Sequence, residues 1–573
     1  MRGLFPSRHP VMGVTHMVCA GHYLAAAAGY RILEEGGNAV DAGVAAGIAI
    51  NVVLPENTNF AGVAPIMIYL AETRSVVTIS GLGCWPKAAD IDYFQRYCNG
   101  QIPTGIRRAV VPAAPDAWLS ALSRYGTLSL ETVLTPALEL ARDGYPLSAV
   151  VRDEMIASES LSDWPENESI FRPGGSVPGL GERLVQTDLA NTFQHLIDTE
   201  RASAHLGRQE AIRSARNEFY KGEIARKIVG FSEANDGLLT YDDLSTFEVG
   251  HEAPVSGQFR DTTIYSCGPW CQGPVVPQAL QMLQDDDFRA LGHNTPEYVH
   301  LLSQTLDLCF ADRDRFFGDP KFIDVPMERL LSPDYTRARR GGIDMSRAFT
   351  EMPPHGLSDL GQRSAAPLTA SNSSKRYETD TSYTCVVDRW GNALSATPSD
   401  SNLRNPIIPG LGFSLSGRGT QSWLESDHAS RVAPGKRPRL TPNPAIVLRG
   451  DQLLMPFGCP GGDAQCQAMV QTFLNIIAFG MDPQSAIEQP RFCTWNFPNS
   501  FWPHEYHPGS LHMEGRFPQE TADELRRRGR DVTRVGDWES MDMGVMSAIV
   551  RDPESGVLSG GADPRRETYA IGR

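Results

Sequence analysis

The chain has 573 residues, of which 41% are hydrophobic and 21% are charged, and its formal net charge is −16 at pH 7. This composition is typical of a globular protein with ample length for a large core. The negative charge argues against nucleic acid or an anionic membrane as a partner. No break in composition divides the chain, so we expect one large intertwined unit.

Ten cysteines are scattered along the chain without the Cys-x-x-Cys or Cys/His spacing of a zinc site. We therefore expect no metal and no cofactor, and cysteines that act as small buried hydrophobic residues in a reducing compartment. Residues 1–18 lack a basic region followed by an apolar run, so no signal peptide is expected. The most apolar run, residues 39–54, is short and contains Asp41, which favours a buried helix over a membrane span. These features predict a cytoplasmic location.

The first predicted elements are two helices followed by two strands. Residues 22–35 are rich in alanine and end at a pair of glycines, which predicts a helix. Asn38 can cap the next helix, which is apolar on most faces and is therefore expected in the core. Residues 66–70 and 76–80 are typical of strands separated by a turn.

A loop-like segment precedes a predicted hairpin in the second half of the chain. Residues 352–375 are rich in proline, serine, alanine and glycine and have no helical or strand period, which predicts a loop or a linker. Residues 380–399 combine strand-favouring residues with a turn around Gly391, which predicts a β-hairpin. If Val387 lies opposite Ala393, Thr381 faces Ser399 with Cβ atoms roughly 5 Å apart.

Two interpretations of this Thr381–Ser399 pair are open. The first is an ordinary cross-strand pair of hydroxyls on a half-buried sheet. The second requires Thr381 to become a chain terminus, because a freed α-amine can act as the base for its own hydroxyl.

A glycine-rich turn marks a second candidate region. Residues 457–463 follow a predicted strand, residues 453–457, and precede an amphipathic helix. Glycines that lead into a helix expose backbone N–H groups that can hold an anion, and no Gly-Lys-Ser/Thr follows to indicate a phosphate loop. The structural alternative is a plain strand–helix turn capped by Asp463.

The stretch Thr-Ser-Tyr-Thr-Cys-Val-Val-Asp-x-x-Gly-Asn-Ala, which begins at Thr381, resembles the segment that opens the small subunit of γ-glutamyltransferases. These enzymes are N-terminal-nucleophile (Ntn) hydrolases that are made as one chain and cut themselves before a threonine. Further stretches that resemble the family occur in the family's order over nearly the whole chain: residues 36–42, 125–145, 219–222, 237–244 and 311–320.

The resemblance implies an α+β fold, a four-layer αββα sandwich formed from both processed chains. It implies cleavage between Asp380 and Thr381 into a large subunit, residues 1–380, whose residues 352–380 form a flexible tail, and a small subunit, residues 381–573. The two subunits are expected to stay associated, and a dimer of such pairs is left open.

The resemblance also implies roles for individual residues. Thr381 is the expected nucleophile and Ser399 the hydroxyl that orients it, while Gly461 and Gly462 match the family's oxyanion hole. Thr397 is a second candidate support, with an ordinary strand threonine as the alternative.

The substrate-recognition positions depart from the family. Leu82 stands where the family has an arginine for the substrate carboxylate, and Gln421 stands where it has an acid for the substrate ammonium. Thr441 retains one hydroxyl of a serine pair. Arg418 is expected to anchor an anionic substrate group, with Arg439 as its competitor and a surface arginine paired with Glu425 or Asp427 as the structural alternative.

These features predict a self-processing Ntn amidohydrolase that opens a small-molecule amide through a threonyl ester and passes the acyl group mainly to water. Its substrate is expected to differ from γ-glutamyl compounds and to be closer to those of acylases or of oxamate amidohydrolase. One alternative is a genuine γ-glutamyltransferase with an unusual pocket. Another, from a different class, is an inactive homologue that serves as a binding protein.

Overall fold

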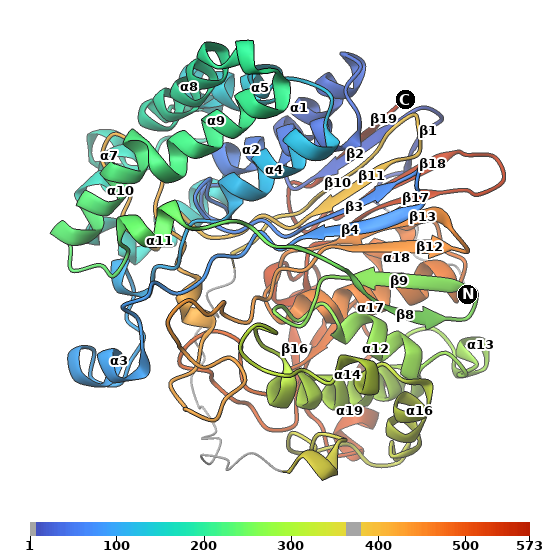
Figure 1. Cartoon of the computed structure of the whole chain (residues 1–573). Coiled ribbons are helices and arrows are strands. Elements are labelled where there is room, and N and C mark those ends of the chain that lie inside the picture. The colour runs from blue at the N-terminus through green and yellow to red at the C-terminus, as the bar shows by residue number, and fades with distance from the viewer. Residues whose placement is uncertain (1–6, 362–379) are drawn as a thin grey trace.

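The structure is a computed structural model that describes residues 7–361 and 380–573. Two seven-stranded antiparallel sheets lie at its centre (Figure 1). The first contains, in order, β1 (Val11–Gly13), β18 (Leu558–Ala562), β17 (Ser547–Arg551), β13 (Gln452–Gly458), β12 (Ala445–Arg449), β9 (Thr262–Ser266) and β8 (Val255–Phe259). The second contains β19 (Tyr569–Gly572), β2 (Met17–Ala20), β10 (Thr384–Val387), β11 (Ala393–Ala396), β3 (Ile66–Leu70), β4 (Ser75–Ile79) and β7 (His251–Glu252).

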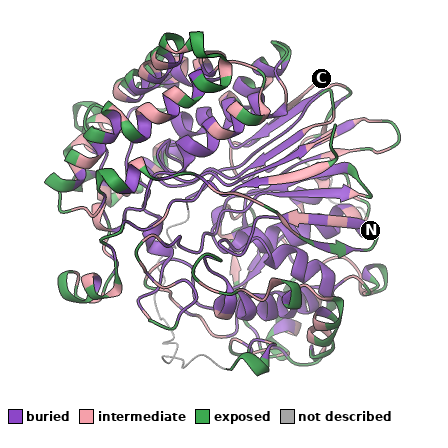
Figure 2. Ribbon diagram, viewed as in Figure 1, coloured by how far each residue is buried: buried purple, intermediate pink, exposed green. Residues whose placement is uncertain are grey.

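The alternation of side chains along β10 shows how the two sheets are joined. Cys385 and Val387 belong to the apolar cluster between the sheets, which also contains Ile446 of β12 and Ile549 of β17. Val386 belongs instead to the cluster beneath the helices. Because successive strand residues point to opposite faces and both faces are covered, every residue of β10 is buried, as Figure 2 shows for most of the central strands.

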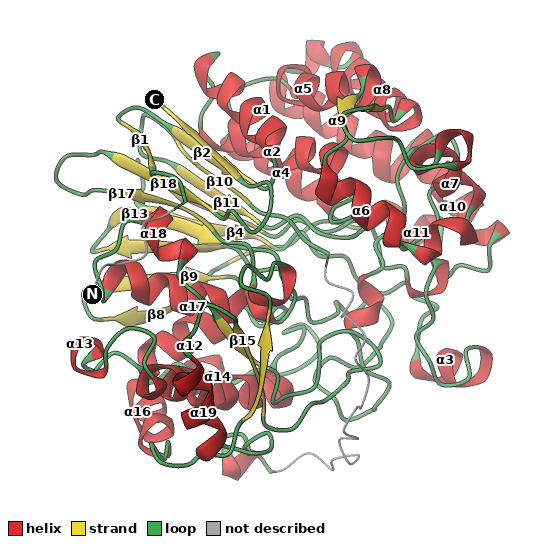
Figure 3. Ribbon diagram, turned by 180° about the vertical axis from the view of Figure 1, so that it is seen from behind, coloured by secondary structure: helices red, strands yellow, loops and turns green. Residues whose placement is uncertain are grey.

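Helices cover the outer faces of both sheets (Figures 1 and 3). On the second sheet lie α1 (Tyr23–Glu34) and α2 (Ala39–Val53), with α4 (Ala114–Tyr125), α5 (Leu130–Asp143), α8 (Thr187–Ala202) and α9 (Arg208–Lys221) packed outside them. Against the first sheet lie α12 (Val275–Met282), α17 (Ala464–Ile477) and α18 (Pro483–Glu488), with α14 (Pro296–Phe316) packed on α12. The prediction of an α+β protein is confirmed, with two large antiparallel sheets.

The remaining elements lie around these layers. Two small sheets contain β14 (Phe492–Thr494), β15 (Ser510–Glu514) and β16 (Asp531–Val535), and β5 (Tyr145–Pro146) and β6 (Arg183–Leu184). The other helices are α3 (Ile91–Tyr97), α6 (Ala149–Ala157), α7 (Pro165–Phe171), α10 (Glu223–Ala234), α11 (Tyr241–Ser245), α13 (Phe288–Leu291), α15 (Met327–Leu330), α16 (Pro333–Gly341) and α19 (Gln519–Arg527).

Local sequence signals place the first elements correctly. The Asn38 side chain accepts hydrogen bonds from the Val40 and Asp41 N–H groups at 2.8 and 3.0 Å, and Asp41 accepts one from the Asn38 N–H at 2.9 Å. This capping box starts α2 at the predicted residue. The predicted strands at residues 66–70 and 76–80 are β3 and β4 to within one residue.

Both sheets contain strands from either side of the Asp380–Thr381 bond. β10 pairs with β2, β11 pairs with β3, and β12 pairs with β9. Neither portion of the chain can therefore complete a sheet by itself, which confirms the expected intertwined unit.

Other sequence predictions have mixed outcomes. Residues 362–379, most of the predicted tail at 352–380, lie outside the described residues, while residues 352–361 are irregular apart from a 3₁₀ turn at Ser358–Leu360. All ten cysteines are free thiols and eight are buried, as expected of small hydrophobic residues. Within residues 7–361 and 380–573, no helix combines the length and the apolar character that crossing a bilayer requires.

Candidate active site at the Asp380–Thr381 bond

The predicted hairpin and its register are confirmed. β10 and β11 are antiparallel, with Val387 opposite Ala393, and beyond the strands the Ser382 N–H donates to the Pro398 carbonyl at 2.9 Å. This register brings Thr381 and Ser399 side by side at the open end of the hairpin. Their hydroxyl oxygens are 2.7 Å apart and both side chains are buried.

The carbonyl oxygen of Asp380, which belongs to the bond expected to break, is surrounded by donors. Ser399 Oγ donates to it at 2.6 Å and Arg418 Nη2 donates to it at 3.1 Å. Thr381 Oγ1 contacts the same oxygen. Donors at this position can stabilise the negative charge that develops on the oxygen when the hydroxyl attacks the carbonyl carbon.

Arg418 lies in the 3₁₀ turn Arg418–Gln421 and is only 1% exposed. Its Nη2 contacts the Asp380 carboxylate, and its Nε lies 3.3 Å from Asp400 Oδ1. The other oxygen of the Asp380 carboxylate accepts a hydrogen bond from the Ser401 N–H at 2.9 Å. The alternative of a surface arginine is therefore wrong, and Arg418 lies against the bond that processing would cut.

Asp400 is a site residue that the sequence analysis missed. Its φ is +94°, in the left-handed region that non-glycine residues rarely occupy, and such strain clusters at functional sites. Its carboxylate accepts hydrogen bonds from Ser416 Oγ at 2.6 Å and the Gly417 N–H at 3.1 Å. Burial raises the pKa of Asp400 above its ordinary value, and the Arg418 charge opposes this rise. The only sequence signal was its place beside Ser399.

The glycine-rich turn connects β13 to α17, as predicted. Gly461 has φ of +127°, and a Cβ there would lie 2.5 Å from the Met541 carbonyl oxygen, so the turn requires glycine. Gly462 also has a positive φ, +55°. The adjacent Pro460 and Thr381 line the same cavity of about 10 Å³. The turn therefore lies beside the nucleophile.

Asp463 does not cap α17 with its side chain. Its carboxylate forms a buried ion pair with Arg313 and accepts a hydrogen bond from the Ser500 N–H at 2.8 Å. The expected side-chain cap by Asp463 is therefore wrong, while the role of the turn as an oxyanion hole stays a prediction. These bonds instead hold the start of the helix to distant segments of the chain.

Two of the predicted substrate residues contact each other. Gln421 Nε2 donates to Thr441 Oγ1 at 2.8 Å, and both side chains are buried. Gln272 Nε2 then joins the carbonyls of Thr441 and Gly462, at 3.0 and 2.8 Å. A chain of hydrogen bonds therefore connects this pair to the glycine turn.

The other predicted residues have different surroundings. Leu82 belongs to the apolar cluster between the sheets and lines a separate cavity of about 200 Å³. Arg439 is buried, with its guanidinium 4.4 Å from the centre of the Trp423 ring, and it donates to the Arg313 carbonyl at 3.2 Å. Among the described residues the Thr397 hydroxyl has no hydrogen-bond partner, so its role as a support stays a prediction.

Residues that the sequence analysis did not single out line the same cavity as Thr381. Asn57 and Arg566 line the cavity beside Thr381. Behind them, Glu56 accepts hydrogen bonds from Asn57 at 2.8 Å and from Arg566 at 3.4 Å. Burial raises the pKa of Glu56 to about 7, although the Arg566 charge opposes this rise. No local pattern in the sequence pointed to these residues.

Comparisons with known proteins agree with this geometry. The family model described as gamma-glutamyltranspeptidase matches residues 25–573. The glutathione hydrolase-like YwrD proenzyme of Bacillus subtilis is 34% identical and covers 98% of this chain and 99% of its own. The oxamate amidohydrolase proenzyme of Klebsiella pneumoniae is 29% identical, over 97% of this chain and 98% of its own.

A solved structure extends the likeness to the fold. The crystal structure of cephalosporin acylase from Bacillus halodurans superposes with a TM-score of 0.85 at 27% identity, over 100% of this chain and 99% of that chain. The family model and the relatives span both sides of the Asp380–Thr381 bond. The chain therefore belongs to the gamma-glutamyltranspeptidase family of Ntn hydrolases.

Proposed function

We propose that this chain is the precursor of an amidohydrolase that cuts itself before Thr381 and then uses Thr381 as an N-terminal nucleophile on an amide other than a γ-glutamyl compound. The observation that carries the proposal is the group around the Asp380 carbonyl. The hydroxyls of Thr381 and Ser399 are 2.7 Å apart, and Ser399 and Arg418 both donate to the carbonyl oxygen of the bond to be cut.

Processing would take place in two steps. Thr381 Oγ1 attacks the Asp380 carbonyl carbon, the C–N bond breaks, and the hydroxyl proton ends on the Thr381 nitrogen. The product is an ester that links Asp380 to Thr381 Oγ1. Water then adds to the ester carbonyl, the C–O bond breaks, and the products are a chain that ends at Asp380 and a chain that begins with a free Thr381 amine.

Turnover would use the same hydroxyl with a new base. The freed α-amine, whose reference pKa is near 8, takes the proton from Oγ1 as the oxygen attacks the substrate carbonyl. Gly461 and Gly462, on the turn beside the nucleophile, are proposed to stabilise the tetrahedral intermediate, a contribution of roughly 3 kcal/mol per donor. The amine product leaves, and water releases the acyl group as an acid. The large and small subunits remain joined in one αββα sandwich, because strands of one pair with strands of the other in both sheets.

The recognition residues favour a substrate without a γ-glutamyl group. Leu82, in the apolar cluster between the sheets, stands where the family resemblance calls for an arginine, and the Gln421 amide is bonded to Thr441 where it calls for an acid. The relatives named above include an amidohydrolase and an acylase as well as a glutathione hydrolase-like protein. We propose that this chain follows the first two in acting on another small amide.

A screen for amine release tests this function. Purified protein is first checked for an N-terminal Thr381 and then given a panel of N-acyl and primary amides, with γ-glutamyl anilide as the comparison. We expect turnover of at least one acylamide above that of the γ-glutamyl compound. A processed protein that turns over the γ-glutamyl anilide best would establish the genuine γ-glutamyltransferase instead. A chain that stays intact and inactive would establish the binding protein.

A further inference from the structure

We propose that the side chain of Asp380 marks the acyl-carboxylate subsite of the mature enzyme. Its substrates would then be amides of four-carbon dicarboxylic acids, with the free carboxylate two carbons away from the carbonyl that reacts. This inference rests on the proposed function, because it names the acyl group which that enzyme accepts.

The first step of the argument is chemical. The ester formed during processing joins the Asp380 carbonyl to Thr381 Oγ1, and water removes it. The acyl-enzyme of turnover joins the substrate carbonyl to the same oxygen, and water removes it in the same way. Asp380 is therefore the first acyl group that the nucleophile carries, and the surroundings of its side chain are those that a substrate acyl group meets.

The second step is the set of contacts that this acyl group makes. Arg418 contacts one oxygen of the Asp380 carboxylate, and the Ser401 N–H donates to the other at 2.9 Å. The same Arg418 Nη2 also lies 3.1 Å from the carbonyl oxygen that reacts. Because the guanidinium is 1% exposed, its bonds to a carboxylate are made away from water. One buried cation therefore fixes both ends of the acyl group.

The third step is the balance of charge. In the uncut chain, one guanidinium lies between the carboxylates of Asp380 and Asp400. Cleavage gives Asp380 a second carboxylate at its new terminus, and the added repulsion from Asp400 favours the departure of the terminus. Asp400 then remains with Arg418. An incoming carboxylate would restore the two-to-one arrangement for which the site is built.

The fourth step is the length of the acyl group. In Asp380, two carbon atoms, Cα and Cβ, separate the reacting carbonyl from the carboxylate. A succinyl group has the same spacing, whereas malonyl has one intervening carbon and glutaryl has three. A γ-glutamyl group also has three, and its ammonium would approach the guanidinium. The contacts to Asp380 thus favour succinyl-type amides, including N-acylaspartyl amides.

Kinetics on the processed wild-type enzyme test the assignment. The anilides of oxalic, malonic, succinic and glutaric acid are compared with butyryl anilide, which has the length of succinyl without its charge. We expect kcat/KM for succinyl to exceed that for butyryl by roughly 10- to 150-fold, the contribution of one charged hydrogen bond, and to exceed malonyl and glutaryl by about 10-fold or more. Equal rates for succinyl and butyryl would overturn the subsite.

Binding of free succinate provides a test that does not depend on turnover. By calorimetry, the mature enzyme should bind succinate at least about 10-fold more tightly than malonate or glutarate, while the uncut Thr381→Ala chain, in which Asp380 fills the subsite, should bind none. Equal succinate binding by the mature enzyme and the uncut chain would refute the assignment of the subsite. Succinate binding without hydrolysis of any amide would refute the proposed function and leave the subsite standing. Hydrolysis of neutral acylamides without succinate binding would refute the subsite and leave the proposed function standing.

A chain that never processes can still be tested. In Asp380→Ala the guanidinium loses one of its two neighbouring carboxylates, so added acetate should recover part of the lost thermal stability. The same acetate should leave the wild-type precursor unchanged. No recovery in the variant would overturn the assignment.

Discussion

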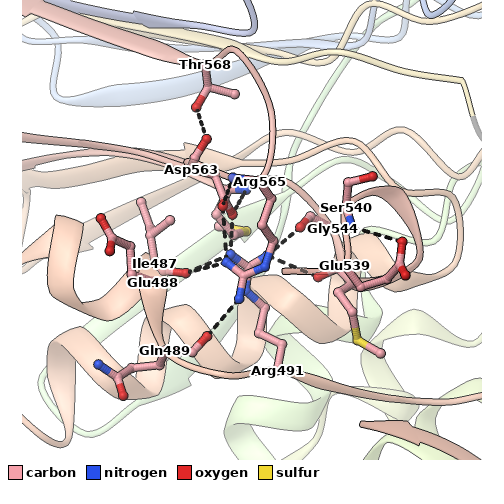
Figure 4. Close-up of polar contacts among 12 residues, drawn as sticks. Ile487, Glu488, Gln489, Arg491, Glu539, Ser540, Gly544, Asp563, Arg565 and Thr568 are labelled. Atoms are coloured by element: carbon pink, nitrogen blue, oxygen red, sulfur yellow. Dashed lines mark hydrogen bonds and ion pairs between the residues drawn. The ribbon is translucent and has the colours of Figure 1, made fainter. Parts of the chain in front are cut away.

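Two groups of buried arginines in this protein differ in how their charges are balanced. In the first, Arg418 serves two carboxylates, Asp380 and Asp400. In the second, near the end of the chain, Arg491 and Arg565 both pair with Asp563 (Figure 4). Arg565 also pairs with Glu514 at 2.6 Å. The first group has more acids than cations, whereas the second has more cations than acids, because Arg516 also contacts Glu514 at 2.6 Å.

The ratio of cations to acids is reflected in the pKa values of Asp400 and Asp563. Burial alone raises the pKa of a carboxyl group, and it does so at both sites. At Asp563 the charges of Arg491 and Arg565 overcome burial and hold the pKa below its ordinary value. At Asp400 a single arginine does not overcome burial and the charge of Asp380, and the pKa stays raised.

The two groups also differ in their relation to the Asp380–Thr381 bond. Every member of the Arg491–Arg565 group lies after Thr381, so processing leaves it intact, and it ties α18 to β18 and β15. The Arg418 group has one acid on the other side of the bond. A fixed group whose acids all have enough cations stabilises the fold, whereas a group with an excess of acids that loses one member can accept a substrate carboxylate.

Replacement of Thr381 by alanine should have the largest effect, because it keeps Asp380 beside Arg418 and removes the nucleophile. The Thr381→Ala chain should remain uncut and lose all turnover, because both processing and catalysis use the hydroxyl. The uncut chain should remain folded, because all the ion pairs of both groups remain. A denaturing gel, an intact mass and an amide-hydrolysis assay measure the outcome. Two chains, or residual turnover by one chain, would contradict the assignment of the nucleophile.

Glutathione should be a poor substrate by two to four decades in kcat/KM relative to the best acylamide. The two polar anchors of a γ-glutamyl group are missing at Leu82 and Gln421, and each charged hydrogen bond is worth roughly 1.5–3 kcal/mol. Arg418 adds repulsion of the substrate ammonium. Gln421→Glu should narrow this difference in kcat/KM, whereas Gln194→Glu, at a half-buried position on α8 outside the site, serves as the control. Efficient glutathione hydrolysis by the wild type would contradict this interpretation.

The nucleophile end of the site could be predicted from the sequence because its signals are local. The hairpin register follows from strand-favouring residues around a turn at Gly391, and it places Ser399 beside Thr381 without any long-range information. The glycine turn before α17 and the cap of α2 are equally local. The resemblance to the family then assigned roles to residues that the pattern had already brought together.

The contacts among Arg418, Asp380 and Asp400 could not be predicted, because they are tertiary contacts between irregular segments. Arg418 and Asp380 are 38 positions apart, and the intervening residues 400–417 have no helix or strand. The sequence favoured Arg418 over Arg439 as the anchor for an anionic group, but it could not place either residue relative to the Asp380–Thr381 bond. In the structure one lies on the bond to be cut, whereas the other stacks over Trp423. The positive φ of Asp400, an ordinary residue in the sequence, completes the site.

Removal of one acid from each group tests the comparison through stability. In the uncut Thr381→Ala background, Asp563→Asn should lower the free energy of unfolding by about 3–5 kcal/mol, because it leaves two buried arginines undercompensated. Asp380→Asn should cost less, about 1–3 kcal/mol, because Arg418 keeps Asp400. In the processed enzyme, Asp563→Asn should still lower the free energy of unfolding, whereas Asp380→Asn should leave it unchanged. Chemical denaturation measures all four values, and equal losses at Asp380 before and after processing would show that the terminus stays in the site.

A third group, around Arg566, gives the smallest expected effect. Arg566 lies 3.4 Å from Glu56 and 2.9 Å from Glu154, so it again serves two acids with one cation. Burial raises the pKa of Glu56 from 4.5 to about 7. Since the folded-state pKa lies above the unfolded value, the free energy of unfolding should fall as pH rises between about 4.5 and 7, and Glu56→Gln should remove this fall. At pH 8 the variant should be more stable than wild type by up to about 3 kcal/mol.

Glu154→Gln is the matched control. It leaves Glu56 as the only acid paired with Arg566, so the pH at which the fall in the free energy of unfolding ends should be lower. Identical pH profiles for wild type and Glu56→Gln would show that one arginine suffices for two buried acids here, and would weaken the same argument for Arg418.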